Sequence, residues 1–276
     1  MDTERTYSFT TYDEVISNII QRVAPATVLD VGAGSGKYGR MVRSLFPDAR
    51  ITALEPDRES VIAHGLNDVY DEVLEIGAQA LIEQHPTRTF DVVIMGDVIE
   101  HMRKSEGVDI IDFLTYRSSY ILIVTPEAMI INASPWYLGH ISAWSSADFA
   151  NHTNWASDQL GQMQLFILRG YQTEALSLKH LVAQINAEAL TISYGDTSGV
   201  CDLTQVRTTH TITDTRADGT SETWGWRANE SDVTLISRPD TAVVPCLGIG
   251  AARLSPGDQA QAAEGYPSGS LNRVSP

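Results

Sequence analysis

A short segment near the amino terminus has the composition of a cofactor-binding turn. Residues 28–40 read VLDVGAGSGKYGR, so glycines at every second position follow an apolar run that ends in Asp30. A strand that turns through glycines into a helix presents backbone N–H groups and the positive helix end to a ligand. A dinucleotide-binding turn would need its third glycine at the position of Lys37, and no G-K-[ST] sequence of a phosphate-binding loop follows. The spacing therefore favours another kind of nucleoside cofactor.

An acidic residue follows the next apolar run at the distance that a ribose contact needs. Glu55 closes this run, ITALEPD, and a carboxylate there can accept hydrogen bonds from both ribose hydroxyls. Its separation from the glycines by roughly 20 residues is typical of one β-α-β unit. Glu55 thus indicates a nucleoside, although dinucleotides share this feature.

A second group of residues combines carboxylates with imidazoles. In DVIEHM, Asp97, Glu100 and His101 stand at i, i+3 and i+4 and would share one face of a helical turn. His140, in HISAWSSADF, is a fourth candidate. Such a set can bind a divalent cation such as Mg, Mn or Zn, or can supply a general base to an alcohol. The residues alone leave both uses open.

Predicted helices and strands alternate around these candidates as far as Pro126. An amphipathic helix is expected at 12–23, and the apolar strands are expected at 27–31, 49–55, 71–76, 90–96 and 119–126. Strands this continuously apolar are buried on both faces, as in a parallel sheet covered by helices. The prediction is an α/β fold with a doubly wound, mostly parallel, Rossmann-like sheet. Ligands bind such sheets at the carboxyl ends of the strands, where both candidate groups fall.

The pattern changes after Pro126. A long connection rich in aromatic residues is followed by a helix expected at about 147–168. Further on, TTHTITDT and WGWRANESDVTLIS flank RADGTS and predict a hairpin that turns at Asp218 and Gly219. From Ala251 the chain has few apolar residues and many Gly, Pro, Ser and Gln, which is typical of a flexible tail. We expect a cofactor-binding domain at 1–197, a β-rich extension at 198–250 and a tail at 251–276.

The composition restricts the partners. The 276 residues carry a formal net charge of -16, which disfavours binding to a long polyanion such as nucleic acid. Cys201 and Cys246 have no metal-ligand spacing, and no stretch approaches the ~18 apolar residues that a membrane span needs. We therefore expect a cytoplasmic protein with no membrane partner, whose oligomeric state the sequence leaves open.

Together the three motifs VLDVGAGSGKYGR, ITALEPD and FDVVIMGDVIEHM resemble those of class I S-adenosylmethionine-dependent methyltransferases, over residues 28 to about 149. The resemblance implies that the domain at 1–197 binds S-adenosylmethionine as methyl donor. It implies these contacts: Asp30 near the donor amino group; Gly32, Gly34 and Gly36 along its methionine and ribose parts; Glu55 at the ribose hydroxyls; Asp97 and Val98 beside its adenosyl and methionyl groups. Where many members carry an acid for the adenine amine, this chain has only Gly77, Ala78 and Gln79.

The segment around His140 resembles two groups of the same superfamily. Bacterial methyltransferases of sugars or small secondary metabolites often read H-x-S-x-W there, as this chain does from His140 to Trp144. Small-RNA 2'-O-methyltransferases use an E-x-x-E-H metal motif and a histidine from this loop, which implies a metal set of Asp97, Glu100, His101 and His140. Asp97 stands where that motif has glutamate, so a metal-free role is favoured. Trp136, Tyr137 and Trp144 could stack on a planar acceptor.

The expected function is transfer of a methyl group from S-adenosylmethionine to an oxygen of a small hydroxylated metabolite or glycan. His101 and His140 are the candidate catalytic residues, because an alcohol becomes a good nucleophile only when its proton leaves. Two alternatives remain: a metal-assisted RNA 2'-O-methyltransferase, and a non-catalytic scaffold that binds the nucleoside.

Overall fold

The structure is a computed structural model of the 276-residue chain. It describes residues 8–127, 139–152, 154–172, 175–207, 209–215, 219, 221–228, 232–237, 245–247 and 251–252. The contacts within the chain divide it into two units, residues 1–208 and residues 209–276. Each unit is built around its own β-sheet.

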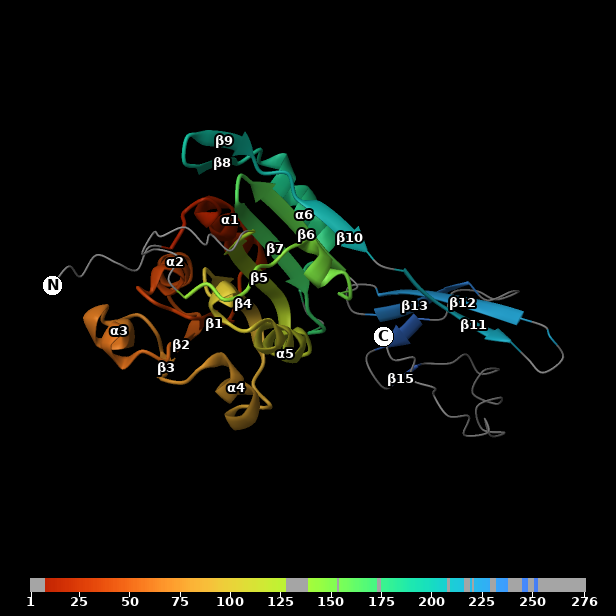
Figure 1. The fold of residues 1–276 in the computed structure, drawn as a ribbon, viewed down its shortest axis with the longest axis horizontal. Helices are drawn as coiled ribbons and strands as arrows, with labels where there is room; N and C mark the ends of the chain where they lie inside the picture. The colour runs from red at the N-terminus through yellow and green to blue at the C-terminus, as the bar shows by residue number, and fades with distance from the viewer. Residues whose placement is uncertain are drawn as a thin grey trace. The chain divides into compact units, whose positions relative to one another are not determined.

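An eight-stranded sheet forms the centre of the first unit, in the order β10-β6-β7-β5-β4-β1-β2-β3 (Figure 1). Its strands are β1 (Thr27–Val31), β2 (Arg50–Leu54), β3 (Glu72–Leu74), β4 (Phe90–Gly96), β5 (Ser118–Pro126), β6 (Asn154–Leu160), β7 (Met163–Arg169) and β10 (Thr204–Arg207). Strands β3, β2, β1, β4 and β5 pair in parallel, whereas β7, β6 and β10 add antiparallel pairs. The predicted doubly wound, mostly parallel sheet is confirmed.

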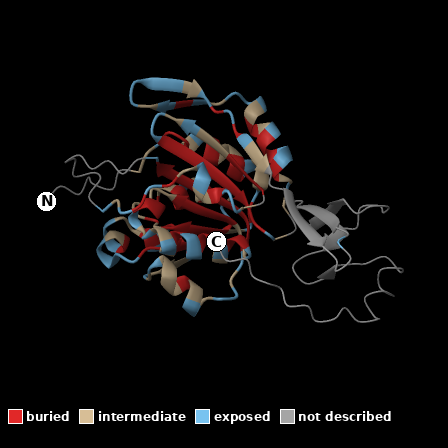
Figure 2. Cartoon of the chain, turned by 45° about the vertical axis from the view of Figure 1, so that its right-hand side comes forward, coloured by how far each residue is buried: buried red, intermediate tan, exposed pale blue. Residues whose placement is uncertain are grey.

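Helices cover both faces of this sheet and bury its strands (Figure 2). The first face carries α1 (Asp13–Val23), α2 (Lys37–Leu45), α3 (Arg58–Ala63), η1 (Leu66–Asp68) and α6 (Leu178–Ala187). The second carries η2 (Ile99–His101), α4 (Ala78–Gln84), α5 (Lys104–Thr115) and η4 (Ser146–Phe149). Successive strand side chains point to opposite faces, so Val28 belongs to the first core cluster and Leu29 to the second. This is why the strands are apolar at almost every position.

The prediction of a helix at 147–168 is wrong. Among the described residues of this range only η4 is helical, and the chain continues as the hairpin of β6 and β7. All seven residues of β7 are buried, because the strand lies between β5 and β6. Pairing and burial on both faces outweigh the local helix preference of a segment that reads MQLFILR.

The boundary expected at residue 197 lies too early. After α6, strands β8 (Thr191–Tyr194) and β9 (Thr197–Val200) form a separate hairpin. Strand β10 then pairs with β6 at the edge of the central sheet, with Thr204 opposite Ser157. Residues 198–207 therefore belong to the first unit, and the β-rich extension begins at residue 209.

The second unit has a five-stranded antiparallel sheet of β11 (Thr209–Thr215), β12 (Ser221–Ala228), β13 (Asp232–Ser237), β14 (Pro245–Leu247) and β15 (Ala251–Ala252). The predicted hairpin is present as β11 and β12, with Gly219 at φ +83° between them. Asp218, at the predicted turn, lies outside the described residues. Of the tail expected at 251–276, Ala251 and Ala252 form β15 and pair with β14, so the prediction is wrong for these two residues. The rest of the tail lies outside the described residues and stays a prediction.

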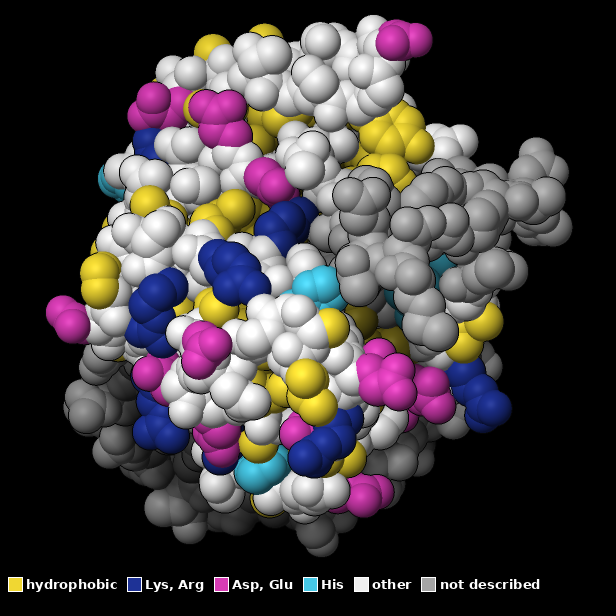
Figure 3. Space-filling view, turned by 90° about the vertical axis from the view of Figure 1, so that its left-hand side faces the viewer, with side chains coloured by type: hydrophobic (Ala, Val, Ile, Leu, Met, Phe, Trp, Pro, Cys, Tyr) yellow, Lys and Arg dark blue, Asp and Glu magenta, His cyan; other side chains and the backbone are white. Residues whose placement is uncertain are grey.

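Charged side chains are mixed on the face of the molecule in Figure 3. Lysine and arginine lie scattered among acidic, apolar and uncharged side chains and form no continuous basic track over the residues described on this face. In the described part of the chain, no helix combines the length and the apolar character needed to cross a membrane.

Candidate active site

The glycine turn lies where the sheet reverses its winding. β1 pairs with β2 on one side and β4 on the other, so the segments after β1 and β4 leave the sheet side by side. Gly32 has φ +68°, and a Cβ atom there would lie 2.4 Å from Cγ2 of Val98. Only glycine allows both this backbone conformation and this approach. The switch point of a doubly wound sheet is the usual place for a nucleotide-like ligand.

A cavity of about 310 Å³ opens at this point. Its walls are apolar apart from a few polar groups; the lining residues are Val31, Gly32, Leu54, Pro56, Ile76, Gly77, Ala78, Gln79, Val98, His101, Met102 and Glu106. A Cβ atom at Gly77 would have no atom within 4 Å, so the glycine leaves open space there. An apolar slot of this size with a few polar groups fits the adenosyl part of a donor.

Two of the predicted donor contacts, Gly32 and Val98, line the cavity, and Glu55 is fixed nearby. One carboxylate oxygen of Glu55 accepts a hydrogen bond from the Gly34 N–H at 2.8 Å. The other accepts one from the Asp57 N–H at 2.9 Å. Because each carboxylate oxygen can accept a second hydrogen bond, Glu55 still has acceptor capacity for ribose hydroxyls. The structure thus joins Glu55 to the glycine loop 21 residues away.

Asp30 does not line this cavity, although the resemblance implies a contact with the donor amino group. Its side chain is buried, and its Oδ2 accepts a hydrogen bond from the Tyr70 hydroxyl at 2.6 Å. Burial raises the pKa of the Asp30 carboxyl to about 6. In this structure Asp30 is a buried residue at the start of the glycine loop, and its side chain contacts Tyr70.

Asp97 follows β4 in a left-handed conformation, at φ +53°. Its Oδ2 accepts hydrogen bonds from the Ser8 hydroxyl at 2.6 Å and from the Phe9 N–H at 2.9 Å. The Lys37 ammonium donates to the Phe9 carbonyl at 2.8 Å and holds the same segment. Oδ1 of Asp97 is buried and has no hydrogen-bond partner among the described residues. Burial raises the pKa of this carboxyl to about 6.

Three of the four candidate metal ligands come together. The ligand atoms of Glu100, His101 and His140 all lie within 4.8 Å of one another, and the two imidazole centroids are 4.6 Å apart at 83°. Glu100 is buried, and its Oε1 has no hydrogen-bond partner among the described residues, whereas Oε2 accepts from the Thr125 hydroxyl at 3.1 Å. Asp97 is outside this group.

The same three residues have shifted pKa values. Burial, together with the nearby charge of Asp97, raises the pKa of the Glu100 carboxyl to about 8. Desolvation lowers the pKa of His101 and of His140 below the usual value. Both imidazoles are therefore neutral at pH ~7 and can accept a proton or bind a cation.

Backbone contacts bring His140 to the end of β4. The N–H groups of Ile141 and Ser142 donate to the Glu100 carbonyl at 2.8 and 3.1 Å. The Trp144 indole donates to the Ile99 carbonyl at 3.2 Å, and its ring is buried. Trp144 therefore anchors the segment and offers no face to an acceptor. Trp136 and Tyr137 lie outside the described residues.

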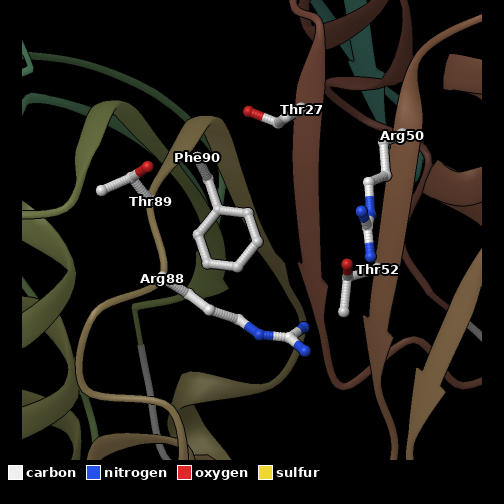
Figure 4. Close-up of a pocket in the computed structure, with 6 residues that line it drawn as sticks. All are labelled: Thr27, Arg50, Thr52, Arg88, Thr89 and Phe90. Carbon is white, nitrogen blue, oxygen red and sulfur yellow. The ribbon is translucent and has the colours of Figure 1, made fainter.

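A second cavity, of about 240 Å³, lies at the opposite, amino ends of the strands (Figure 4). It is lined by Thr27, Arg50, Thr52, Arg88, Thr89 and Phe90. Both Arg88 Nη atoms donate to the Glu72 carboxylate, at 2.7 and 2.8 Å, and Arg50 lies 3.7 Å from it. Glu72 pairs with both guanidinium groups, so this cavity lies at an ion-paired edge of the sheet.

Several residues at the site were not predicted. Pro56, Ile76 and Met102 line the cavity beside the glycine turn, and their position shortly after β2, after β3 and after His101 is the signal that could have identified them. Tyr70 and Ser8 carry no such signal, since their partners are 40 and 89 residues away in the chain.

Sequence comparison gives one family match. Residues 29–114, less than half of the chain, match a family described as "Methyltransferase domain". The matched segment runs from β1 into α5 and contains the glycine loop, Glu55, Asp97 and His101. A search of the curated proteins found no significant match.

Solved structures with a similar fold include three methyltransferases. An O-methyltransferase family protein from Burkholderia thailandensis has 15% identity and a TM-score of 0.44, over 57% of this chain and 56% of its own. The plantazolicin methyltransferase BpumL, in complex with SAH, has 10% identity and a TM-score of 0.45, over 59% and 83%. The mitomycin 7-O-methyltransferase MmcR has 19% identity and a TM-score of 0.40, over 56% and 53%.

Structural similarity at this level says nothing about the methyl acceptor of this chain. The matched part of the chain spans only about half the length of the first and third of these proteins. The donor side is better defined. The family match covers the same residues that form the glycine turn and the donor cavity. Over residues 29–114 this protein is therefore similar to the methyltransferase domain family, and these residues form the part of the Rossmann-like sheet that holds the glycine turn.

Proposed function

We propose that the protein transfers a methyl group from S-adenosylmethionine to a hydroxyl oxygen of a small metabolite or glycan. The observation that carries the proposal is the position of His101. Its side chain borders the donor cavity, and its ring also belongs to the group with Glu100 and His140. A candidate proton acceptor thus borders the cavity proposed for the donor.

The donor supplies an electrophilic methyl group on its sulfonium. The residues of the chain hold the two reactants in line, which is the main requirement of such a displacement. Gly32 and Val98 shape the donor cavity, and the Glu55 carboxylate offers oxygens to the ribose. The attacking hydroxyl must lose its proton, and the neutral imidazole of His101 or His140 can take it. The methyl–sulfur bond breaks as the oxygen–methyl bond forms.

A divalent metal is the second way to activate the hydroxyl. Glu100, His101 and His140 offer one carboxylate and two imidazoles, a set that suits Zn or Mn, and the unpartnered Oε1 of Glu100 fits a ligand role. A bound metal would lower the pKa of the hydroxyl. We favour the metal-free mechanism, because Asp97 is bonded to Ser8 and Phe9 and lies outside the group.

A sugar or small metabolite is favoured over RNA as acceptor. The chain has a net charge of -16, and RNA binding depends on basic side chains that contact phosphates. The H-x-S-x-W segment, in which Ser142 and Trp144 fix His140 beside Glu100, agrees with the resemblance to sugar and small-metabolite methyltransferases.

The test supplies the protein with a donor that carries a deuterated methyl group. Small-metabolite, glycan and RNA fractions of a cell extract are incubated separately and searched by mass spectrometry for labelled products. A labelled hydroxyl compound in the first two fractions is expected. Label in RNA alone, or donor binding with no labelled product in any fraction, would contradict the proposal and favour the RNA enzyme or the scaffold.

With the acceptor known, alanine in place of the histidine that acts as the base, His101→Ala or His140→Ala, should lower the rate about 100-fold to 10,000-fold. If a metal activates the hydroxyl instead, both variants should lose metal affinity. His180→Ala, on α6, is the matched control and should have normal activity. Chelator separates the two mechanisms: it should leave the rate unchanged if an imidazole is the base. Near-normal rates in both active-site variants would eliminate acceptor activation by these histidines.

A further inference from the structure

We infer that Tyr70 is a positioning residue for the methyl donor: its hydroxyl connects Asp30 to the start of α2 and so fixes the glycine loop between them. The inference rests on the donor binding proposed above. Tyr70 lies between η1 and β3, outside the three sequence motifs and outside the lining of the donor cavity.

Two hydrogen bonds define the connection. The Tyr70 hydroxyl donates to Oδ2 of Asp30, the fourth residue of β1, at 2.6 Å. The same oxygen accepts a hydrogen bond from the N–H of Gly39, in the first turn of α2, at 3.2 Å. The loop from Gly32 to Gly36 lies between these two anchored residues. One hydroxyl therefore holds both ends of the donor loop.

Helix α2 lacks a side-chain N-cap, so its first N–H groups need an acceptor from elsewhere in the chain. The first backbone N–H groups of a helix have no partners within the helix and are usually satisfied by the side chain of the N-cap residue. The N-cap of α2 is Gly36, which has no side chain. The Tyr70 hydroxyl supplies the missing acceptor for Gly39 from a distant segment.

The tyrosine ring also explains a glycine that the cofactor motif does not. A Cβ atom at Gly39 would lie 2.2 Å from Cζ and 2.4 Å from the hydroxyl oxygen of Tyr70, which is too close for any side chain. A Cβ atom at Gly36 would lie 3.6 Å from Cε2 of the same ring. Tyr70 is 5% exposed, so the ring fills the space beneath the loop. A side chain at position 39 would therefore collide with Tyr70, and one at position 36 would contact its ring.

The Tyr70 hydroxyl also affects the pKa of Asp30. Burial raises the pKa of Asp30 to about 6; the hydrogen bond from Tyr70, the backbone N–H of Gly39 and the charge of Lys37 on α2 lower it, and the charge of Glu55 after β2 raises it. Loss of the hydroxyl would raise the pKa of Asp30 further. Near pH 6, more of the carboxyl would then be protonated, and the loop would lose a charged anchor.

The experiment measures the affinity of S-adenosylhomocysteine by calorimetry near pH 6 and near pH 8. The variant is Tyr70→Phe, which keeps the ring and removes only the hydroxyl. The matched control is Tyr12→Phe, because Tyr12 is equally buried and its hydroxyl donates to Asp158 at 3.0 Å, away from the loop. Thermal melting shows how much each variant loses in stability.

Tyr70→Phe should weaken binding about tenfold near pH 8, the usual effect of one lost hydrogen bond to a charged group, and by a larger factor near pH 6. Tyr12→Phe should bind as the wild type does, even where its melting temperature falls. Equal affinity of Tyr70→Phe and wild type at both pH values, or an equal loss in both variants, would overturn the inference. Wild-type protein that binds no S-adenosylhomocysteine would instead overturn the proposed donor site.

Discussion

The donor side and the acceptor side of the site treat their carboxylates differently. On the donor side, Glu55 accepts hydrogen bonds from two backbone N–H groups, and Asp30 accepts one from Tyr70. On the acceptor side, Glu100 keeps one buried oxygen without a hydrogen-bond partner among the described residues. Glu55 and Asp30 thus have hydrogen-bond donors from the protein itself. The free oxygen of Glu100 is suited to accept a hydrogen bond from a bound substrate or to bind a cation.

This difference has a cost in stability. A buried polar group without a partner destabilises a fold by about 1–3 kcal/mol. The pKa of Glu100 is raised to about 8, so the folded protein resists ionisation of this carboxyl, whereas the unfolded chain ionises it near the usual value. Between those two pKa values the folded state binds more protons, and stability falls as the pH rises.

The largest effect is expected on the donor side, from Gly32→Leu. The new side chain would begin 2.4 Å from Cγ2 of Val98 and would require φ +68°, so the loop must move and the cavity close. Binding of S-adenosylhomocysteine, measured by calorimetry, should be lost. Gly195→Leu is the control: Gly195 has φ +56°, but no atom lies within 4 Å of its Cβ position, so donor binding should be kept. Normal donor binding by Gly32→Leu would show that the cavity is elsewhere.

A smaller effect is expected on the acceptor side, where Glu100→Gln should increase the stability of the fold at high pH. The amide cannot ionise, so the variant should melt at a higher temperature than the wild type above about pH 8 and at a similar temperature near pH 5. Methyl transfer should fall while donor binding stays normal. Melting curves over this pH range, recorded with chelator, check the first part. A variant less stable than wild type throughout would mean that ionised Glu100 has a partner.

The smallest effect is expected from the carboxyl-terminal segment. Removal of residues 253–276 should leave donor affinity and the melting transition of the first unit unchanged, because this segment has too few apolar residues to join a core. Calorimetry and melting of the shortened chain, next to the full chain, check this. A lower donor affinity would give the segment a part in the site.

Sequence patterns predicted the first half of the fold well and the second half poorly. From β1 to β5, apolar strands and amphipathic helices alternate, and the structure follows them. The segment at 147–168 has no such guide, since MQLFILR is compatible with a buried helix or a buried strand. Its state depends on the free edge of β5, with which β7 pairs from Tyr120 to Pro126.

The candidate site divides in the same way. Glu55 and the glycines were predicted in the right neighbourhood, because both follow adjacent strands of one β-α-β unit. The partner of Asp30 could not be predicted, because Tyr70 reaches it from a segment with no regular pattern. The metal set was predicted with four members, and the structure brings together three.

The sequence by itself determined where glycines expose the backbone and where acidic residues follow strands, because local spacing fixes strand ends, turns and helix starts. Only the tertiary structure decided which carboxylates are satisfied. Ser8 reaches Asp97 across 89 positions, and Tyr70 reaches Asp30 across 40, whereas one oxygen of Glu100 is left without a partner among the described residues. Burial and hydrogen bonding depend on which distant segments meet, and these contacts set the pKa values of the site.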